Sequence, residues 1–210
     1  MEIIRKIDTI EVKKCFAISQ LIRWSKGKKS YLVPISRSDF IKQLSLTKDK
    51  VNKMTDKEID KIVGYRFLRR LRMYNNYNWK LCKFNIDEVG VWRRAGGLPL
   101  DFTNKNLSDT ASRVKIDMLD GSHKLKKRSK IAIKSILDTN IDILQTEKYL
   151  LPIAFLGGTG TRGRKRLKFK TKLDLDDGCM RSIALAVSGK EEIVGYVGFP
   201  PEINENISNN

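Results

Sequence analysis

Apolar residues in the C-terminal half of the chain fall into short runs separated by polar turns. Tyr149–Leu156 and Glu192–Val197 are apolar over the length of a strand, and Lys165–Leu175 alternates apolar and polar side chains. Gly178–Ser188 has the spacing of a short helix, and another helix is expected near Ser129–Leu137. Strands interspersed with helices predict an α/β fold of the mixed α+β class.

The N-terminal half contains one helix with a well-marked start. Thr55 is followed three residues later by Glu58, which is the pattern of a capping box. Apolar residues at helical spacing then continue as far as Tyr74, so the pattern predicts one helix from Thr55 to Tyr74. A strand over Trp79–Ile86 is expected after the asparagine-rich turn that follows.

The first fifty residues have a weaker pattern, with short β segments around a helical piece at Phe16–Trp24. The β segments are Ile3–Val12 and Ser30–Ile35. A polar, turn-rich stretch that begins at Gly96 suggests a soft boundary near residue 110. The expected organisation is therefore a basic, partly helical N-terminal region over 1–110, an α/β domain over 111–200 and a flexible tail over 201–210.

Charge is the strongest compositional signal. The 210 residues include 42 Lys and Arg against 24 Asp and Glu, a formal net charge of +18. Almost all of this excess lies in three windows, Arg66–Lys83, Arg113–Lys134 and Arg162–Lys172. Clustered cations suit polyanions because each neutralised phosphate releases a counterion, so DNA or RNA is the expected partner. The alternatives are a solvated basic surface or an acidic protein partner.

Composition also excludes several classes. No run approaches the about 18 apolar residues of a membrane helix, and charge from Glu2 onward argues against a secretory signal, so no membrane partner is expected. The three cysteines are widely spaced and lack a CxxC pair, which favours a reducing, cytoplasmic compartment. A single histidine and no cysteine cluster predict no resident metal site. The oligomeric state is not indicated.

Arginines and aromatic residues are interleaved around the predicted helix. Arg69 and Arg72 flank its apolar stripe and are expected to contact nucleic acid. Tyr77 and Trp79, beside a turn, are the candidates for base stacking. Tyr74 lies on the apolar face and is expected in the core.

The segment Gly158–Gly163 matches the GxGxxG pattern but is followed by strand-like alternation, with Leu173 and Leu175 on one face and Asp174 on the other. A dinucleotide fingerprint must open a helix, so this interpretation is rejected. A basic hairpin that meets phosphates is expected instead; the alternative is an ordinary hairpin with a solvated edge. Its basic residues are Arg162, Arg164, Lys165, Arg166 and Lys168.

The sharpest feature is the turn Asp177–Arg181, where an alternating strand meets a short helix. A helix start offers free backbone N–H groups and a positive dipole end, and Arg181 could add a bidentate contact to a phosphate. Cys179, at the helix start, could be reactive. Asp177 could cap the helix or accept a proton. The structural alternative is a helix capped by Asp177, with Cys179 buried and Arg181 in a surface ion pair.

The order of motifs over residues of about 130–200 resembles the ParB/sulfiredoxin superfamily. Its elements are the Pro-Ile strand Leu151–Phe155, the turn Asp177–Arg181, the helix Ser182–Gly189 and the strand Glu192–Val197. The resemblance implies a ParB/sulfiredoxin-like fold that binds a nucleoside phosphate. Gly178, Arg181 and Ser182 would then contact the phosphate, and Asp177 would be the acid of the turn.

Superfamily activities include nucleotide-gated DNA clamps, serine kinases, sulfinic-acid reductases and proposed nucleases. Cys179 coincides with the reactive cysteine of sulfiredoxin, but Met180 stands where the family usually has histidine. The leading hypothesis is a nucleic-acid-associated protein that binds a nucleoside triphosphate or diphosphate with Mg²⁺. Phosphoryl transfer or hydrolysis is its candidate reaction, with Asp177 catalytic. The alternatives are a non-catalytic DNA-binding module and a thiol enzyme that uses Cys179.

Overall fold

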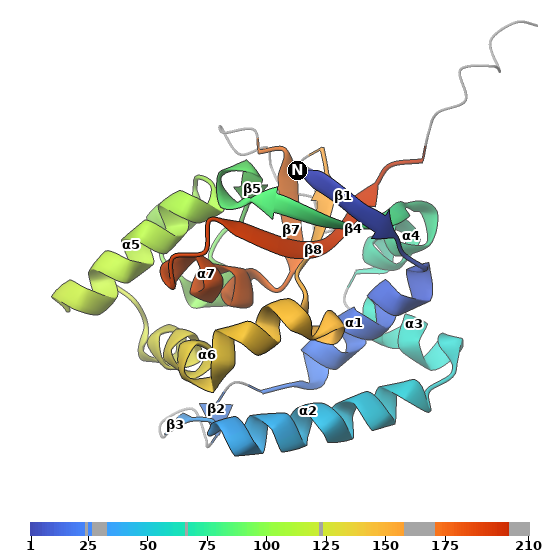
Figure 1. Ribbon diagram of the computed structural model, residues 1–210, viewed down its shortest axis with the longest axis horizontal. Coiled ribbons are helices and arrows are strands. Elements are labelled where there is room, and N and C mark those ends of the chain that lie inside the picture. Colours follow the sequence, from blue (N-terminus) through green and yellow to red (C-terminus); the bar gives the residue numbers. More distant parts are fainter. Residues whose placement is uncertain (24, 27–32, 66, 122–123, 158–170, 202–210) are drawn as a thin grey trace, which may run out of the picture.

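A six-stranded mixed sheet forms the centre of the molecule, with strand order β1-β4-β8-β6-β7-β5 (Figure 1). The computed structural model describes residues 1–201 except 24, 27–32, 66, 122–123 and 158–170. The strands of the sheet are β1 (Glu2–Lys6), β4 (Asn78–Asn85), β5 (Val89–Gly90), β6 (Ile153–Leu156), β7 (Leu173–Asp177) and β8 (Glu192–Phe199). A separate pair is β2 (Ser25–Lys26) with β3 (Val33–Pro34). The mixed α/β class expected from the sequence is confirmed.

Strands from both halves of the chain pair in this one sheet. β4 runs antiparallel to both β1 and β8, with Trp79 opposite Gly198, while β6 is parallel to β8 and antiparallel to β7. The regions expected as 1–110 and 111–200 thus share one sheet, and residue 110 lies inside a helix. Residues 202–210 of the expected tail lie outside the described residues.

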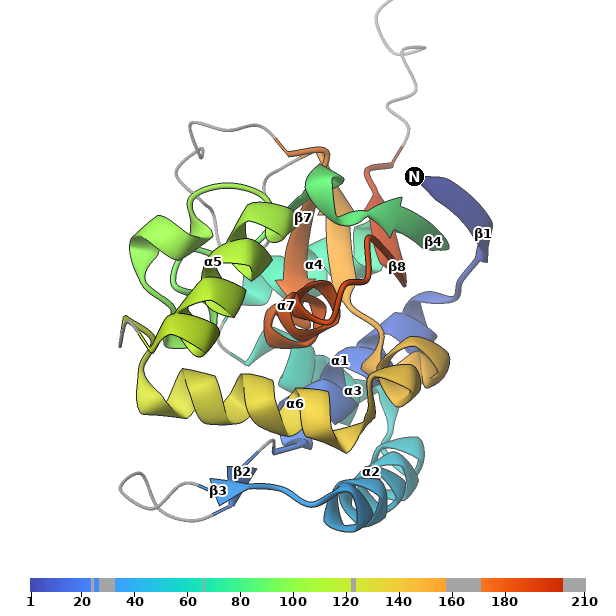
Figure 2. The same cartoon turned by 60° about the vertical axis from the view of Figure 1, so that its left-hand side comes forward.

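Helices cover the sheet in two groups (Figures 1 and 2). α7 packs against α5 and α6, whereas α1 packs against α2, α3 and α4. The α-helices are α1 (Thr9–Leu21), α2 (Arg37–Asn52), α3 (Asp56–Gly64), α4 (Leu68–Asn76), α5 (Leu107–Asp120), α6 (Lys127–Thr146) and α7 (Cys179–Val187). Short 3₁₀ turns are η1 (Ile86–Glu88), η2 (Ala95–Gly97), η3 (Leu100–Thr103) and η4 (Lys148–Leu150).

The helix predicted from Thr55 to Tyr74 is two helices. The capping box is confirmed, because the Thr55 side chain accepts from the Glu58 N–H and Glu58 bonds back to the Thr55 N–H. The continuous helix is wrong: α3 ends at Gly64, and Phe67 is extended (φ −147°, ψ 90°) before α4 begins. Both helices bury an apolar stripe in one core, so helical spacing persists across the break.

Several other local predictions need correction. Ile3–Val12 was expected to be β structure, but the strand ends at Lys6 and α1 begins at Thr9. α2 was not expected, because its stripe is broken by lysines and polar residues. The predictions for α7, β4 and β8 are confirmed to within about two residues, and β7 covers the end of the strand expected at Lys165–Leu175.

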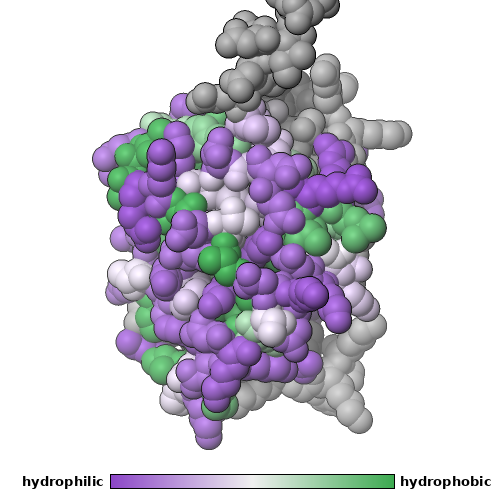
Figure 3. Space-filling model, turned by 90° about the vertical axis from the view of Figure 1, so that its right-hand side faces the viewer, coloured by the Kyte–Doolittle hydropathy of each residue, from purple (hydrophilic) through white to green (hydrophobic). Residues whose placement is uncertain are grey.

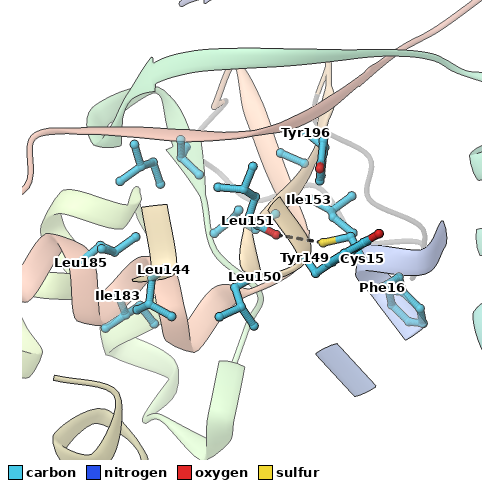
Figure 4. Packing of buried hydrophobic residues seen from close by; sticks show 14 of the residues in the cluster. Cys15, Phe16, Leu144, Tyr149, Leu150, Leu151, Ile153, Ile183, Leu185 and Tyr196 are labelled. Atoms are coloured by element: carbon cyan, nitrogen blue, oxygen red, sulfur yellow. Dashed lines mark hydrogen bonds between the residues drawn. The ribbon is translucent and has the colours of Figure 1, made fainter. Parts of the chain in front are cut away.

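The core joins α1, η4, β6 and β8 (Figure 4). The Cys15 thiol donates to the Leu151 carbonyl at 3.4 Å, and burial raises its pKa well above the usual range. The expectation that Trp79 is a base-stacking side chain is wrong: it is buried, and its indole N–H donates to the Tyr74 carbonyl at 2.9 Å. Tyr77 packs edge-on against Phe155.

Candidate functional site

The strand-turn-helix unit predicted at Asp177–Arg181 is present. β7 ends at Asp177, Gly178 is left-handed (φ 82°, ψ 13°), and α7 begins at Cys179. A Cβ at Gly178 would lie 3.0 Å from Pro152 Cα and 3.0 Å from an Arg181 guanidinium nitrogen. The turn therefore requires glycine both for its backbone angles and for its close neighbours.

Asp177 is held by side chains from outside the turn. Its carboxylate accepts from the Ser19 hydroxyl, from Gln20 Nε2 at 3.0 Å and from Arg181 Nη2 at 2.8 Å. The N-cap of α7 is Gly178 and has no side-chain cap. The interpretation of Asp177 as a helix cap is therefore wrong; this carboxylate ties β7 to α1 and α7.

Arg181 is buried, with only 3% of its surface exposed. Its Nη1 donates to Ser19 Oγ at 3.0 Å, so the alternative of a surface ion pair is wrong. The Arg181 Nε and the Ser182 hydroxyl are also buried, and neither finds a hydrogen-bond partner among the described residues. Buried polar groups are nearly always satisfied, so these two need an explanation.

A cavity of about 290 Å³ opens at this turn. Asp177, Cys179 and Arg181 line it together with Arg93 and Arg94, which precede η2. The exposed guanidinium groups of Arg93 and Arg94 make no hydrogen bond or ion pair within the described part of the chain. The cavity thus has two uncommitted cations beside the positive end of α7.

The loop that carries these arginines is strained and closely packed. Arg94 is left-handed (φ 57°), unusual for a residue with a side chain, and its N–H donates to Thr103 Oγ1 at 2.8 Å. A Cβ on Gly96 would lie 2.1 Å from Met180 Sδ, so this glycine lets η2 approach α7. The sequence analysis does not identify Arg93 and Arg94, because it interprets the stretch that begins at Gly96 as a boundary; the Arg-Arg-Ala-Gly-Gly run is the available signal.

A second acidic residue, Asp176, is buried at the edge of the same cavity. It accepts from Arg70 Nε at 2.8 Å and from the Tyr74 hydroxyl at 3.0 Å, and its side chain is fully buried. Burial raises the pKa of Tyr74, with the Asp176 charge adding to the effect, so the phenol stays a neutral donor. This pair anchors α4 on β7.

The remaining predicted residues lie elsewhere. Arg69 and Arg72 are exposed on α4 and do not line the cavity at the turn. The side of the molecule drawn in Figure 3 is mostly hydrophilic, with small separate hydrophobic patches. The hairpin residues Arg162, Arg164, Lys165, Arg166 and Lys168 lie outside the described residues. The structure thus places Asp177, Gly178 and Arg181 at one cavity, which the buried Ser182 and the exposed Arg69 and Arg72 do not line.

The described residues contain no group of three or more His, Cys, Asp or Glu side chains placed to hold a metal ion. None of their helices has the length and apolar character needed to cross a membrane.

Comparison with known proteins finds no match: no family model, no curated protein and no solved structure is similar to this chain.

Proposed function

We propose that the cavity at the α7 turn binds a nucleoside phosphate, in a protein that associates with nucleic acid. The observation that carries this proposal is the convergence of Arg93 and Arg94 with the N-terminus of α7 on one cavity. Helix N-termini and arginines are the groups that proteins use to bind phosphate. The buried Nε of Arg181, with no partner among the described residues, adds a donor in the same wall.

Each lining group has a role in this proposal. Arg93 and Arg94 neutralise the phosphate charge, while Asp177 and Ser19 hold the Arg181 guanidinium in a fixed plane. The half-buried ring of Trp92 lines the cavity and offers a face for the base. Mg²⁺ would be carried by the phosphates of a triphosphate or diphosphate, because donors already engage Asp176 and Asp177.

Phosphoryl transfer or hydrolysis at this cavity is part of the proposal. Asp177 accepts from the Ser19 hydroxyl, which in turn accepts from Arg181, so a hydroxyl, a carboxylate and a cation adjoin one another. Catalysis of this class depends mainly on positioning and charge stabilisation, which such an arrangement supplies. The resemblance to the ParB/sulfiredoxin superfamily supports the same assignment.

The second candidate is a non-catalytic DNA-binding or RNA-binding module. The net charge of +18 and the exposed Arg69 and Arg72 favour it. In that case the cavity would only sense a ligand. The three free cysteines support a cytoplasmic location in both cases. A thiol enzyme is the third candidate, since Cys179 lines the cavity.

Calorimetry with ATP, CTP and their diphosphates, with and without Mg²⁺, tests the proposal. Arg93→Gln and Arg94→Asn should each weaken binding by about 10- to 150-fold, the value of one charge-assisted bond. Asparagine is chosen at Arg94 because it tolerates left-handed backbone. Arg37→Gln, an exposed arginine on α2 away from the cavity, is the matched control. Absence of nucleotide binding by the wild type would favour the nucleic-acid-binding module.

A further inference from the structure

A second and larger cavity, of about 610 Å³, lies where α1 meets α3 and α4. Its walls include the aromatic side chains of Phe16, Tyr65 and Phe67. Tyr65 is 80% exposed at the end of α3, whereas Phe67 is half-buried at the start of α4. Aromatic rings from three separate positions therefore surround a space open to a ligand.

The wall of this cavity includes the fixed guanidinium of the buried Arg70. The Arg70 guanidinium carbon lies 4.6 Å from the centre of the Phe16 ring and 5.2 Å from that of the Phe67 ring. Two bonds to Asp176, at 2.8 and 3.4 Å, hold the group in place. The guanidinium thus fixes the half-buried Phe67 ring in place, so Phe67 and the exposed Tyr65 can stack on a ligand with little further ordering of Phe67.

The two cavities share a wall. Gln20 lines both, and its amide donates to Asp177. Asp176 lines the first cavity, while its partner Arg70 lines the second. A polymeric ligand with a phosphate in the first cavity would place its next monomer close to the second cavity.

We propose that the second cavity binds a nucleobase and that the ligand of the pair is a single-stranded nucleic acid, with a phosphate at the α7 turn. The inference rests on the proposed function, since it adds a base site to the phosphate site. Stacking on aromatic side chains suits unpaired bases of any sequence. Lys61, in the same wall, and the exposed Arg69 and Arg72 of α4 supply positive charge for the backbone.

The test compares AMP with the 5′-phosphorylated adenine dinucleotide pApA, and the deoxy forms of both, by calorimetry. The wild type should bind the dinucleotide about 5- to 150-fold more tightly than the mononucleotide, the value of one stacked base. Tyr65→Ala and Phe67→Leu should reduce this gain and leave the affinity for AMP unchanged. Tyr65→Ala keeps the test usable if Phe67→Leu fails to fold, because Tyr65 is exposed.

Two controls make the comparison specific. Leu68→Ala changes a residue that is 70% exposed, next to Phe67 but absent from the cavity wall, and should keep the full gain. Lys61→Gln removes a charge from the cavity wall and should weaken dinucleotide binding. Lys57→Gln removes an exposed charge of the same helix that does not line the cavity, so it should leave the affinity for the dinucleotide unchanged.

Equal affinities for mononucleotide and dinucleotide in the wild type would overturn the inference but leave the phosphate site intact. The same holds if the gain persists in Tyr65→Ala and Phe67→Leu. Failure of the wild type to bind AMP, pApA and also ATP, CTP and their diphosphates would instead overturn the proposed function, and with it the base site.

Discussion

Asp176 and Asp177 are neighbours at the end of β7, and each pairs with an arginine from a different helix. The Asp176–Arg70 pair is buried and fully bonded: Tyr74 adds a third bond, and the rings of Phe16 and Phe67 flank the guanidinium. The Asp177–Arg181 pair borders a cavity, and the Arg181 Nε has no partner among the described residues. One ion pair therefore completes the fold, while the other retains bonding capacity for a ligand.

Breaking the buried Asp176–Arg70 pair should have the largest effect. Asp176→Ala leaves the Arg70 charge buried without its partner, which costs about 3–5 kcal/mol of unfolding free energy. Urea denaturation followed by circular dichroism measures the change. The double variant Asp176→Leu with Arg70→Met removes both charges and should recover most of the loss, as an apolar replacement does. A cost below about 1 kcal/mol for Asp176→Ala would show that the Asp176–Arg70 pair contributes little to stability.

Breaking the Asp177–Arg181 pair should show whether Arg181 contributes to stability alone or also to nucleotide binding. Arg181→Ala leaves the Asp177 carboxylate with only Ser19 and Gln20 as donors, so the unfolding free energy should fall by about 1–3 kcal/mol. Nucleotide affinity should fall as well, by about 10- to 150-fold. Arg181→Lys keeps the charge but not the fork of donors, so it should recover more stability than affinity. Equal recovery of both would assign Arg181 a purely structural role.

The same contrast exists within α4, where Arg70 is buried and its neighbours are exposed. Replacing Arg69 and Arg72 together by Gln should change stability by less than about 0.5 kcal/mol per site. If each contacts a phosphate, the salt dependence of nucleic-acid affinity should flatten by roughly 0.9 in log–log slope per residue on duplex. Fluorescence anisotropy between about 50 and 200 mM salt measures it. Lys42→Gln with Lys50→Gln, exposed on α2, is the matched control.

The sequence alone predicts only part of the contrast between Asp176 and Asp177. The glycine after Asp177 and the apolar run that follows indicated a left-handed turn and a helix, and both are present. Alternation along β7 places Asp174 on the polar face, which would either meet phosphates or be solvated, yet Asp174 and Asp176 are each only 2% exposed. Alternation identifies two faces of a strand but not which other element covers them.

The partners of the site could not be predicted for a related reason. Ser19 and Asp177 are 158 positions apart, and α1 was expected to begin only at Phe16. Arg94 reaches the cavity through a left-handed backbone that no local pattern requires of an arginine. Capping boxes and glycine turns depend on neighbouring residues, so they can be predicted from the sequence. A cavity depends on which loops, distant in the sequence, the fold brings together.

The smallest effect is expected at Cys179, which shares the cavity with the open ion pair. Burial raises the pKa of Cys82 to about 11 and that of Cys15 further, so neither forms thiolate near neutral pH. Cys179 is only partly buried and should be the first thiol to react with iodoacetamide, as peptide mass spectrometry would show. Cys179→Ser should nevertheless keep nucleotide affinity within about twofold, because the arginines and the α7 N-terminus carry the binding. Loss of activity in a folded Cys179→Ser variant that still binds nucleotide would instead favour the thiol enzyme.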